Sequence, residues 1–284
     1  MEGTSKRARV LLSFDAEEFD IPREFGFAIG DAETLRVGAE GIARTLDLLD
    51  EVGVRATFFT TARIALHAPE LIVRAAKAGH EIASHGFDHS RFEEADLARS
   101  RGALLEILRS AGVEERLVRV EGFRRPRMAP TDAGAVRGAG YVYHSSENPI
   151  WLPGRYNKFF SPRRWSVEAT AAGELMKIPA AATPMVRWPL FWLSFKNVPL
   201  WWTKLMTGWC LRSDGYAALY FHPWELCELS GAGGFGLPKH VRRLDGQRLT
   251  DRLRRYLLWL KARAEIETYG GFVERAMKER GAGA

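Results

Sequence analysis

The chain has 284 residues, of which 46% are hydrophobic and 27% charged, and this composition is typical of a folded globular protein and excludes a disordered one. Its formal net charge of +6 favours anionic partners, but no nucleic-acid-binding motif accompanies that charge, so we expect no nucleic acid partner. We see no secretory signal, no membrane-spanning apolar run and only two cysteines, and therefore expect a single cytoplasmic domain over residues 1–284.

Strand and helix patterns alternate along the chain. Apolar and β-branched runs predict strands at residues 10–14, 56–61, 80–84, 117–123, 141–143 and 217–221. Apolar residues at helical spacing predict helices that end before Gly53, run over residues 69–77 and 96–111, and follow Leu249; Thr131 is expected to cap a further short helix. This alternation indicates an α/β fold with a parallel sheet wrapped by helices.

Polar motifs follow four of these strands. Asp15, His85, Arg124 and His222 each come directly after an apolar run. Because the carboxyl ends of parallel strands meet at one edge of a sheet, we expect these four side chains to converge on one pocket.

The motif S-H-G-F-D-H places His85 and His89 four residues apart. On one turn of helix, this spacing would bring both imidazoles to the same face, where they could hold one metal ion. Two histidines, a carboxylate and an open water position make a hydrolytic site.

Four motifs occur in the order S-F-D-A-E-E-F, S-H-G-F-D-H, G-F-R-R-P and Y-F-H-P-W-E, over about residues 9–227. In order and rough spacing they resemble the polysaccharide deacetylases with a NodB homology domain (carbohydrate esterase family 4). The resemblance implies a distorted parallel β/α barrel of about seven strands. It also implies a divalent ion, Zn²⁺ or a similar metal, and the removal of N-acetyl groups from amino sugars.

The resemblance also implies roles for individual residues. Asp15 matches the general base, and Arg124 matches the arginine that orients it. His85 and His89 match the two histidine ligands of the metal, and His222 matches the histidine that protonates the departing amine.

The third metal ligand is less directly indicated. Many family members carry a second Asp after the first, but here Ala16 follows Asp15. By the D-x-D or D-x-E pattern of a branch that acts on bacterial glycans, Glu17 is the ligand. In an extended segment Glu17 also faces the same side as Asp15, whereas Glu18, the alternative ligand, faces away. Glu18 and Asp20 are then expected to lie in water.

Three further positions bear on the substrate and on Arg124. The resemblance puts an oxyanion donor at the backbone N–H of Arg127, whose side chain could also bind a phosphate. Trp224 could stack on a sugar ring or simply pack in the interior. His144 stands where related sequences often carry an Asp that helps to hold the arginine, so the support of Arg124 is an open question.

Residues 184–211 hold five of the nine tryptophans, interleaved with Leu, Phe, Lys and Arg. The segment could be a buried part of the core, or an insertion that faces an anionic membrane surface. Pro189 and Pro199 exclude one long helix, so two short helices are expected.

The leading hypothesis is a metal-dependent carbohydrate N-deacetylase in the cytoplasm. A peripheral position on the inner face of the cytoplasmic membrane is the alternative location. Without an export signal, a lipid-linked or nucleotide-linked sugar is a better candidate substrate than mature cell wall. The alternatives are a catalytically silent carbohydrate-binding relative, or the same scaffold cleaving another acyl or amide bond.

Overall fold

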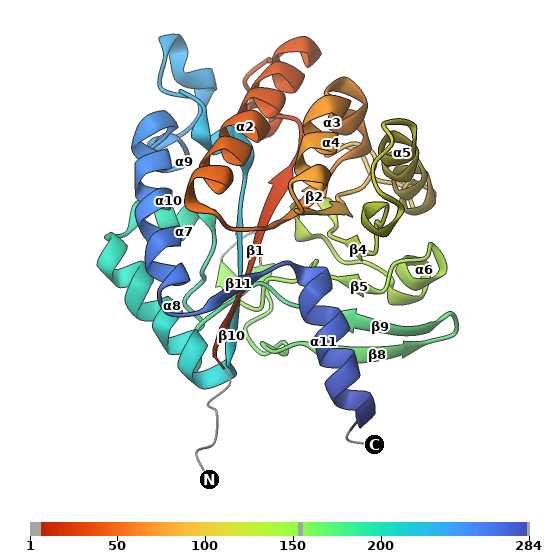
Figure 1. Cartoon of the computed structure of the whole chain (residues 1–284). Helices are drawn as coiled ribbons and strands as arrows, with labels where there is room; N and C mark the ends of the chain where they lie inside the picture. The colour runs from red at the N-terminus through yellow and green to blue at the C-terminus, as the bar shows by residue number, and fades with distance from the viewer. Residues whose placement is uncertain (1–6, 153–155, 283–284) are drawn as a thin grey trace.

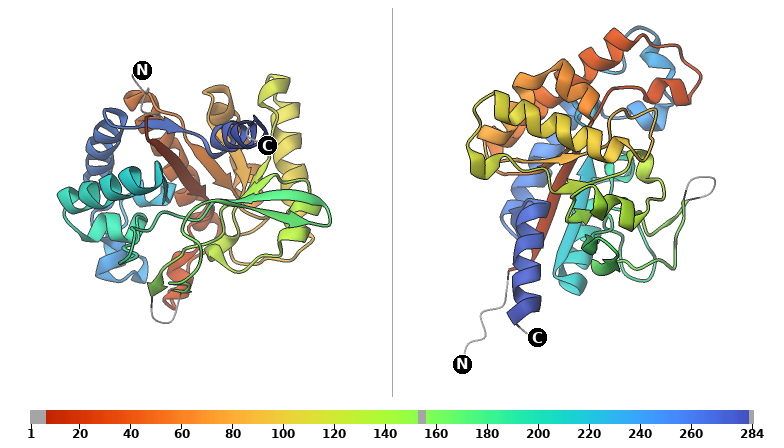
Figure 2. Two further views of the ribbon diagram at one scale, coloured as in Figure 1. Left: turned by 90° about the horizontal axis from the view of Figure 1, so that it is seen from below. Right: turned by 90° about the vertical axis from the view of Figure 1, so that its right-hand side faces the viewer.

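A computed structural model describes residues 7–152 and 156–282 (Figures 1 and 2). One sheet runs through this part of the chain, in the order β10-β1-β2-β3-β4-β5-β9-β8, with β11 beside the start of β1. Every pairing in this sheet is parallel except that of β8 with β9. The sheet therefore contains a run of seven parallel strands, in the order β10, β1, β2, β3, β4, β5 and β9. The strands are β1 (Arg9–Ala16), β2 (Thr57–Thr60), β3 (Glu81–Ser84), β4 (Gly122–Phe123), β5 (Tyr143–His144), β8 (Ser166–Thr170), β9 (Gly173–Lys177), β10 (Tyr216–Phe221) and β11 (Glu265–Glu267).

The sheet curls so that its two ends approach each other. The chain that leaves β9 reaches β10, where the backbone N–H of Ala181 donates to the carbonyl of Ala218 at 2.8 Å. Phe191 then forms an isolated parallel bridge with Tyr220. No continuous ladder closes the circle in the described part of the chain. The expected distorted, mostly parallel β/α barrel is therefore confirmed in its open form.

Helices cover the outside of the sheet. In Figure 1, α2 to α5 lie above and to the right, α8 and α10 lie side by side on the left, and α11 crosses the lower part of the sheet. Their bounds are α1 (Ile21–Glu24), α2 (Asp31–Val52), α3 (Ala62–His67), α4 (Pro69–Lys77), α5 (Asp96–Ser110), α6 (Ala133–Gly138), α7 (Trp192–Asn197), α8 (Leu200–Asp214), α9 (Lys239–Arg242), α10 (Gly246–Lys261) and α11 (Tyr269–Ala282). A separate hairpin joins β6 (Trp151–Leu152) and β7 (Tyr156–Asn157).

The start and stop signals in the sequence correctly bound several helices. α2 ends at Gly53, which adopts the left-handed conformation at φ 66°, and α4 begins at Pro69 as expected. The cap of α6 is a correction, because the carboxylate of Asp132, and not the hydroxyl of Thr131, accepts from the N–H of Ala135.

Two expected strands are much shorter than their apolar runs. Residues 117–123 yield only β4, preceded by a 3-10 turn at Glu115–Leu117, and the strand expected at 141–143 begins at its last residue as β5. Both lie where the barrel is most distorted, and each strand pairs with its neighbours over only one or two residues. The apolar side chains there still fill the core, which explains why the pattern was longer than the strand.

β1 shows how the fold separates its two apolar layers. Val10, Leu12 and Phe14 point outward into the layer shared with the helices. Leu11 points into the inner layer, and Ser13 and Asp15 occupy the next inward positions. The inward face therefore changes from apolar to polar toward the carboxyl end of the strand.

The tryptophan-rich segment forms two helices, α7 and α8, as its prolines predicted. It is divided between interior and surface, because Trp192 is only 6% exposed whereas Trp201 is 64% exposed. Within the described residues, no helix combines the length and the apolar character needed to cross a bilayer.

Gly41 of α2 lets this helix pack against the loop that follows β10. A Cβ atom there would lie 2.5 Å from the backbone nitrogen of Trp224. We expect Gly41→Ala to lower the free energy of unfolding by about 1–3 kcal/mol, because neither backbone can yield easily. Urea unfolding followed by circular dichroism measures this change.

Gly102 in the exposed face of α5 is the matched control, since a Cβ atom there meets nothing within 4 Å. Gly102→Ala should instead stabilise the protein by about 0.5–1 kcal/mol through helix propensity. Equal effects of the two substitutions would contradict the packing of α2 on this loop.

Candidate metal and catalytic site

The acidic segment after β1 is buried, not solvated. Asp15, Glu17, Glu18 and Asp20 are all between 2% and 4% exposed. Asp15 and Glu17 line the same small cavity, as the alternation of an extended chain predicted. Glu18 turns away and accepts from the hydroxyl of Thr61 at 2.9 Å. The expectation that Glu18 and Asp20 lie in water is therefore wrong.

His85 and His89 meet Glu17 at this cavity. Their Nε2 atoms lie 3.1 Å and 3.2 Å from Oε2 of Glu17. The three side chains each offer one ligand atom, and these atoms all lie within 4.8 Å of one another. The two rings stack at 5.7 Å, but the chain between them is a loop and not the helical turn that the spacing suggested.

A second contact fixes each imidazole. Nδ1 of His85 lies 2.8 Å from the carbonyl of Arg124, and Nδ1 of His89 lies 2.7 Å from Oδ1 of Asp20. When these nitrogens carry the proton, the Nε2 atoms are left as electron-pair donors that face Glu17. Two imidazoles held in this way and one carboxylate fit a zinc-type ion with room for further ligands.

The electrostatics of this cluster favour a cation. Burial by itself would lower the pKa of His89, but the charges of Glu17 and Asp20 raise it to about 10. Burial would also raise the pKa of Glu17, yet the nearby His89 and His222 and the hydrogen bond from His85 hold it far below its usual range. The carboxylate of Glu17 thus stays ionised and attracts positive charge.

Asp15 is held by a fully buried arginine. Nη1 of Arg124 donates to Oδ1 of Asp15 at 2.5 Å and to the hydroxyl of Ser13 at 3.0 Å. Its other nitrogens donate to the carbonyl and hydroxyl of Ser145 and to the hydroxyl of Tyr269. Asp15 consequently presents its second oxygen to the cavity.

This arrangement answers the question that His144 raised. His144 is buried, and neither of its ring nitrogens has a hydrogen-bond partner among the described residues. Burial lowers its pKa to about 4, so the ring is neutral and does not support Arg124. Ser13, Ser145 and Tyr269 supply that support instead.

His222 closes the cavity from β10. Its Nε2 lies 4.0 Å from Oδ2 of Asp15 and 3.8 Å from Oε1 of Glu17. On the far side, its Nδ1 lies 3.3 Å from Glu225, which pairs at 3.0 Å with the buried Lys196 of α7. Burial would lower the pKa of His222, but the surrounding carboxylates of Glu17 and Glu225 raise it.

The two residues suggested for substrate binding lie in different settings. Trp224 is 1% exposed, stacks on His222 at 5.0 Å and donates from Nε1 to Oε1 of Glu17 at 3.2 Å. Its ring is thus not accessible to a sugar, and of the two alternatives the structure favours packing. Arg127 lines the cavity with a backbone φ of 59°, and its guanidinium lies 2.8 Å from Glu24.

The cavity itself has a volume of about 40 Å³. Besides the residues above, its walls include Ile21, Met128, Tyr156, Trp192 and Tyr220. All the residues proposed from the sequence, except Arg124 and Trp224, line it; these two lie directly behind Asp15 and Glu17.

Three residues of the site were missed from the sequence. Asp20 and Glu225 belong to the motifs S-F-D-A-E-E-F-D and Y-F-H-P-W-E, so a search for carboxylates near each histidine would have found them. Lys196 lies in the tryptophan-rich segment, and no local pattern connects it with His222.

Comparisons with known proteins agree with this description. Residues 2–119 match the family model described as polysaccharide deacetylase, so the resemblance is confirmed over that part of the chain. No curated protein matches the sequence.

Solved structures share the fold. A predicted polysaccharide deacetylase of Mycobacterium smegmatis is 19% identical with a TM-score of 0.63, over 99% of this chain and 94% of the other. The PuuE allantoinase is 17% identical with a TM-score of 0.57, over 95% and 90%. A predicted polysaccharide deacetylase of Pseudomonas aeruginosa PAO1 is 16% identical with a TM-score of 0.53, over 91% and 86%. At these identities the likeness shows the fold alone.

The geometry separates the two adjacent glutamates as metal ligands. Glu17→Gln should abolish stoichiometric Zn²⁺ binding, because it removes the only carboxylate that reaches both Nε2 atoms in the described cluster. Glu18→Gln, which keeps its hydrogen bond to Thr61, should bind Zn²⁺ as the unchanged protein does. Competition with a chromophoric chelator measures both affinities.

Asp20→Asn is expected to weaken Zn²⁺ binding by about 10- to 100-fold, because the carboxylate of Asp20 holds the ring of His89 without itself being a ligand. Loss of the metal in Glu18→Gln but not in Glu17→Gln would reverse the assignment.

Proposed function

We propose that this protein is a metal-dependent hydrolase that removes an N-acetyl group from an amino sugar. The observation that carries the proposal is the cluster of Glu17, His85 and His89 beside both Asp15 and His222. A divalent ion held by these three residues, Zn²⁺ in the first instance, would acidify a water molecule and polarise the amide carbonyl.

The remaining residues would manage the protons. Asp15 has one oxygen bound by Arg124, and the other faces the cavity, where it could accept the proton of the attacking water. His222, backed by Glu225 and Lys196, would donate a proton to the departing amine. The backbone N–H of Arg127, at the turn beside the cavity, would stabilise the developing oxyanion.

Two other functions remain as alternatives. A catalytically silent carbohydrate-binding relative would not need Asp15 and His222 to flank the metal-type cluster, so their presence supports the hydrolase. Cleavage of another acyl or amide bond is the stronger alternative, because a protein named as an allantoinase shares the fold. Acetate release identifies the N-deacetylase, whereas a different product would identify cleavage of another acyl or amide bond.

Features of the protein surface support a proposal for the carrier of the sugar and for the location of the protein. We propose a lipid-linked or nucleotide-linked amino sugar as substrate, handled in the cytoplasm at the inner face of the membrane. The support for a membrane contact comes from α8, where Trp201 is 64% and Leu205 48% exposed beside Lys204.

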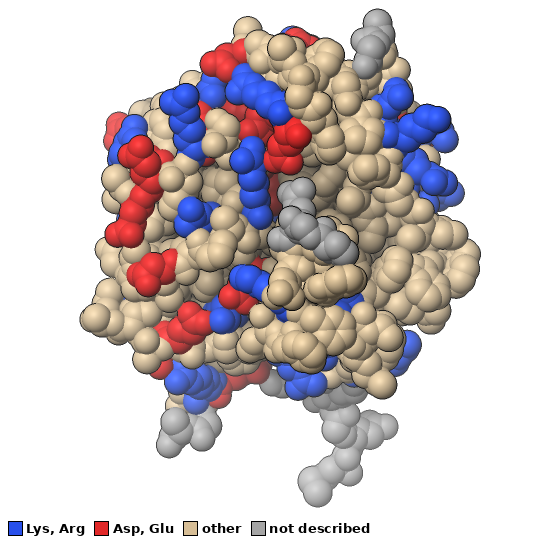
Figure 3. Space-filling view, turned by 180° about the vertical axis from the view of Figure 1, so that it is seen from behind, with Lys and Arg blue, Asp and Glu red and all other residues tan. Residues whose placement is uncertain are grey.

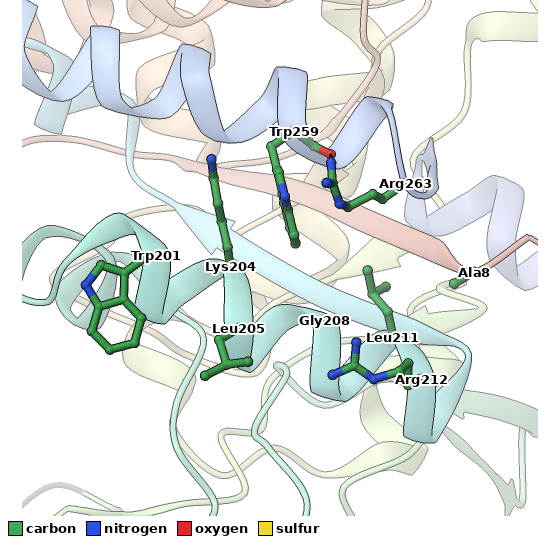
Figure 4. A pocket seen from close by; sticks show the side chains of 9 residues that line it. All are labelled: Ala8, Trp201, Lys204, Leu205, Gly208, Leu211, Arg212, Trp259 and Arg263. Atoms are coloured by element: carbon green, nitrogen blue, oxygen red, sulfur yellow. Dashed lines mark hydrogen bonds between the residues drawn. The ribbon is translucent and has the colours of Figure 1, made fainter.

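Figure 4 shows this region, a groove of about 630 Å³ between α8 and α10. Lys204, Arg212 and Arg263 line it, and none of the described residues in its walls is acidic. Lys204 and Arg263 lie 5.7 Å and 4.9 Å from the ring centre of Trp259. Cations interleaved with exposed aromatic rings are typical of surfaces that contact anionic lipids.

The first test concerns the chemistry. The metal-loaded protein should release acetate from a panel of N-acetyl amino sugars, and Asp15→Asn should lower the rate by about 10²- to 10⁴-fold because it removes the general base. Zn²⁺ binding should persist, since Asp15 is outside the ligand cluster. Enzymatic acetate determination measures the rate.

The matched control is Asp132→Asn, which keeps a good cap for α6 and should leave the rate unchanged. Circular dichroism checks folding, because Asp15→Asn leaves Arg124 without its carboxylate partner. Equal rates for Asp15→Asn and the unchanged protein would contradict the proposed mechanism, and a metal-loaded protein without acetate release would support the alternatives.

The second test concerns the membrane. The protein should sediment with liposomes of anionic phospholipid, less so at high salt, and remain in solution with zwitterionic liposomes. Lys204→Glu should reduce binding severalfold, because it reverses a charge within the groove. Lys278→Glu, an equal charge change at an exposed position of α11, should not. Absence of sedimentation, or equal loss in both variants, would exclude this surface.

A further inference from the structure

A second groove, of about 560 Å³, borders the catalytic cavity. It lies between the β6–β7 hairpin and the segment that leads into α7. Most of its walls are apolar, with contributions from Ile150, Trp151, Leu152, Val186, Trp188 and Leu193.

The groove and the cavity are lined by different residues of the same two elements, α7 and the hairpin. On α7, Trp192 faces the cavity while its neighbour Leu193 lines the groove. On the hairpin, Leu152 of the groove pairs with Tyr156 of the cavity. The two hollows are therefore close enough for one ligand to occupy both, with its reacting end at His222 and its other end in the groove.

The rim of the groove exposes large apolar side chains. Trp151 and Val186 are each 62% exposed, and the adjacent Met185 is 82% exposed. Figure 3 shows the molecule from behind, and below a group of Lys and Arg side chains at the upper right edge, its right-hand side, the side of α7 and α8, carries few charged side chains. Apolar side chains concentrated beside a reactive cavity indicate an apolar ligand.

Arg187 supplies the only guanidinium of this groove within the described residues. Its Nη1 atom is buried and has no hydrogen-bond partner among the described residues, and its guanidinium carbon lies 5.7 Å from the ring centre of Phe159. The nearby Arg163 pairs with Asp214, which also pairs with Arg164, whereas no described carboxylate pairs with Arg187. Its backbone φ of 54° is unusual for a residue other than glycine. These features fit a bound anion, because a buried donor without a partner is costly.

We propose that this groove binds the apolar chain of a lipid-phosphate carrier, with Arg187 on the phosphate, while the linked amino sugar enters the catalytic cavity. The inference rests on the proposed function and narrows its substrate to the lipid-linked class. A nucleotide carrier fits less well, because its polar base and ribose would lie against Trp151, Leu152 and Leu193 without matching polar groups.

The experiment measures binding and not turnover. Dodecyl phosphate, below the concentration at which it forms micelles, is titrated into the full-length zinc-loaded protein by calorimetry, and butyl phosphate serves as the short-chain reference. We expect dodecyl phosphate to bind at least about 100-fold more tightly, because each buried methylene adds to the affinity. Equal affinities of the two phosphates would overturn the proposal.

Variants locate the site. Val186→Asp, at an exposed position of the rim, should weaken dodecyl phosphate about tenfold. Leu66→Asp, the same kind of change at an exposed position of α3 outside both grooves, should leave the affinity unchanged. Leu205→Asp, in the groove between α8 and α10, should weaken dodecyl phosphate less than Val186→Asp does. Arg187→Gln should weaken dodecyl phosphate but not dodecyl glucoside, which carries no charge. A stronger effect of Leu205→Asp than of Val186→Asp would assign the chain to the other groove and overturn the proposal.

Failure of this inference is distinct from failure of the proposed function. Acetate release from water-soluble amino sugars without selective dodecyl phosphate binding would leave a deacetylase whose groove has another role. Selective binding without acetate release would establish the lipid phosphate site and exclude the deacetylase.

Discussion

The ion pair between Arg124 and Asp15 is the interaction on which the rest of the structure depends. Arg124 is 0% and Asp15 3% exposed, and breaking a pair buried so deeply typically costs about 3–5 kcal/mol. The guanidinium also binds oxygens on β1, after β5 and at the start of α11, so a single cation joins parts of the chain far apart in sequence. Because one partner is the candidate base, the same contact that stabilises the interior of the barrel also orients the chemistry.

The other reactive groups follow the same rule, in which each side chain is fixed by a partner behind it. Asp20 holds His89, the backbone of Arg124 holds His85, and Glu225 with Lys196 lies behind His222. The Lys196 contact means that α7 is part of the support of the cavity and not an appendage. This explains why residues 184–211 are half interior and half surface: one side of the segment supports His222, and the other is left to face a ligand or a membrane.

The sequence was sufficient for much of this arrangement because local rules decided it. Strand ends of a parallel sheet must meet at one edge, so the convergence of Asp15, His85 and His222 could be predicted. Alternation along an extended chain also placed Glu17, and not Glu18, on the same side as Asp15. What could not be predicted depends on contacts between distant segments: the burial of Glu18 against Thr61, the role of Lys196, and the replacement of an expected carboxylate at His144 by Ser13, Ser145 and Tyr269. The helical turn inferred for the two histidines was wrong because the glycine between them, Gly86 at φ 83°, sends the chain into a loop that reaches the same geometry by another path.

The buried charges of the site give an argument for a divalent ion that does not depend on the motifs. Four carboxylates, those of Asp15, Glu17, Asp20 and Glu225, are at most 4% exposed. Arg124 pairs with Asp15, Lys196 pairs with Glu225, and the partly exposed Arg127 lies 3.7 Å from Asp20. Glu18 is set apart, since burial raises its pKa to about 7 and Arg63 lies 3.9 Å away. When His85 and His89 are neutral, as ligands must be, Glu17 has no Lys or Arg partner among the described residues, and its buried negative charge would be costly without a cation. A divalent cation between Glu17, His85 and His89 would offset that charge, so the charge of the pocket and the geometry of its ligands indicate the same kind of ion.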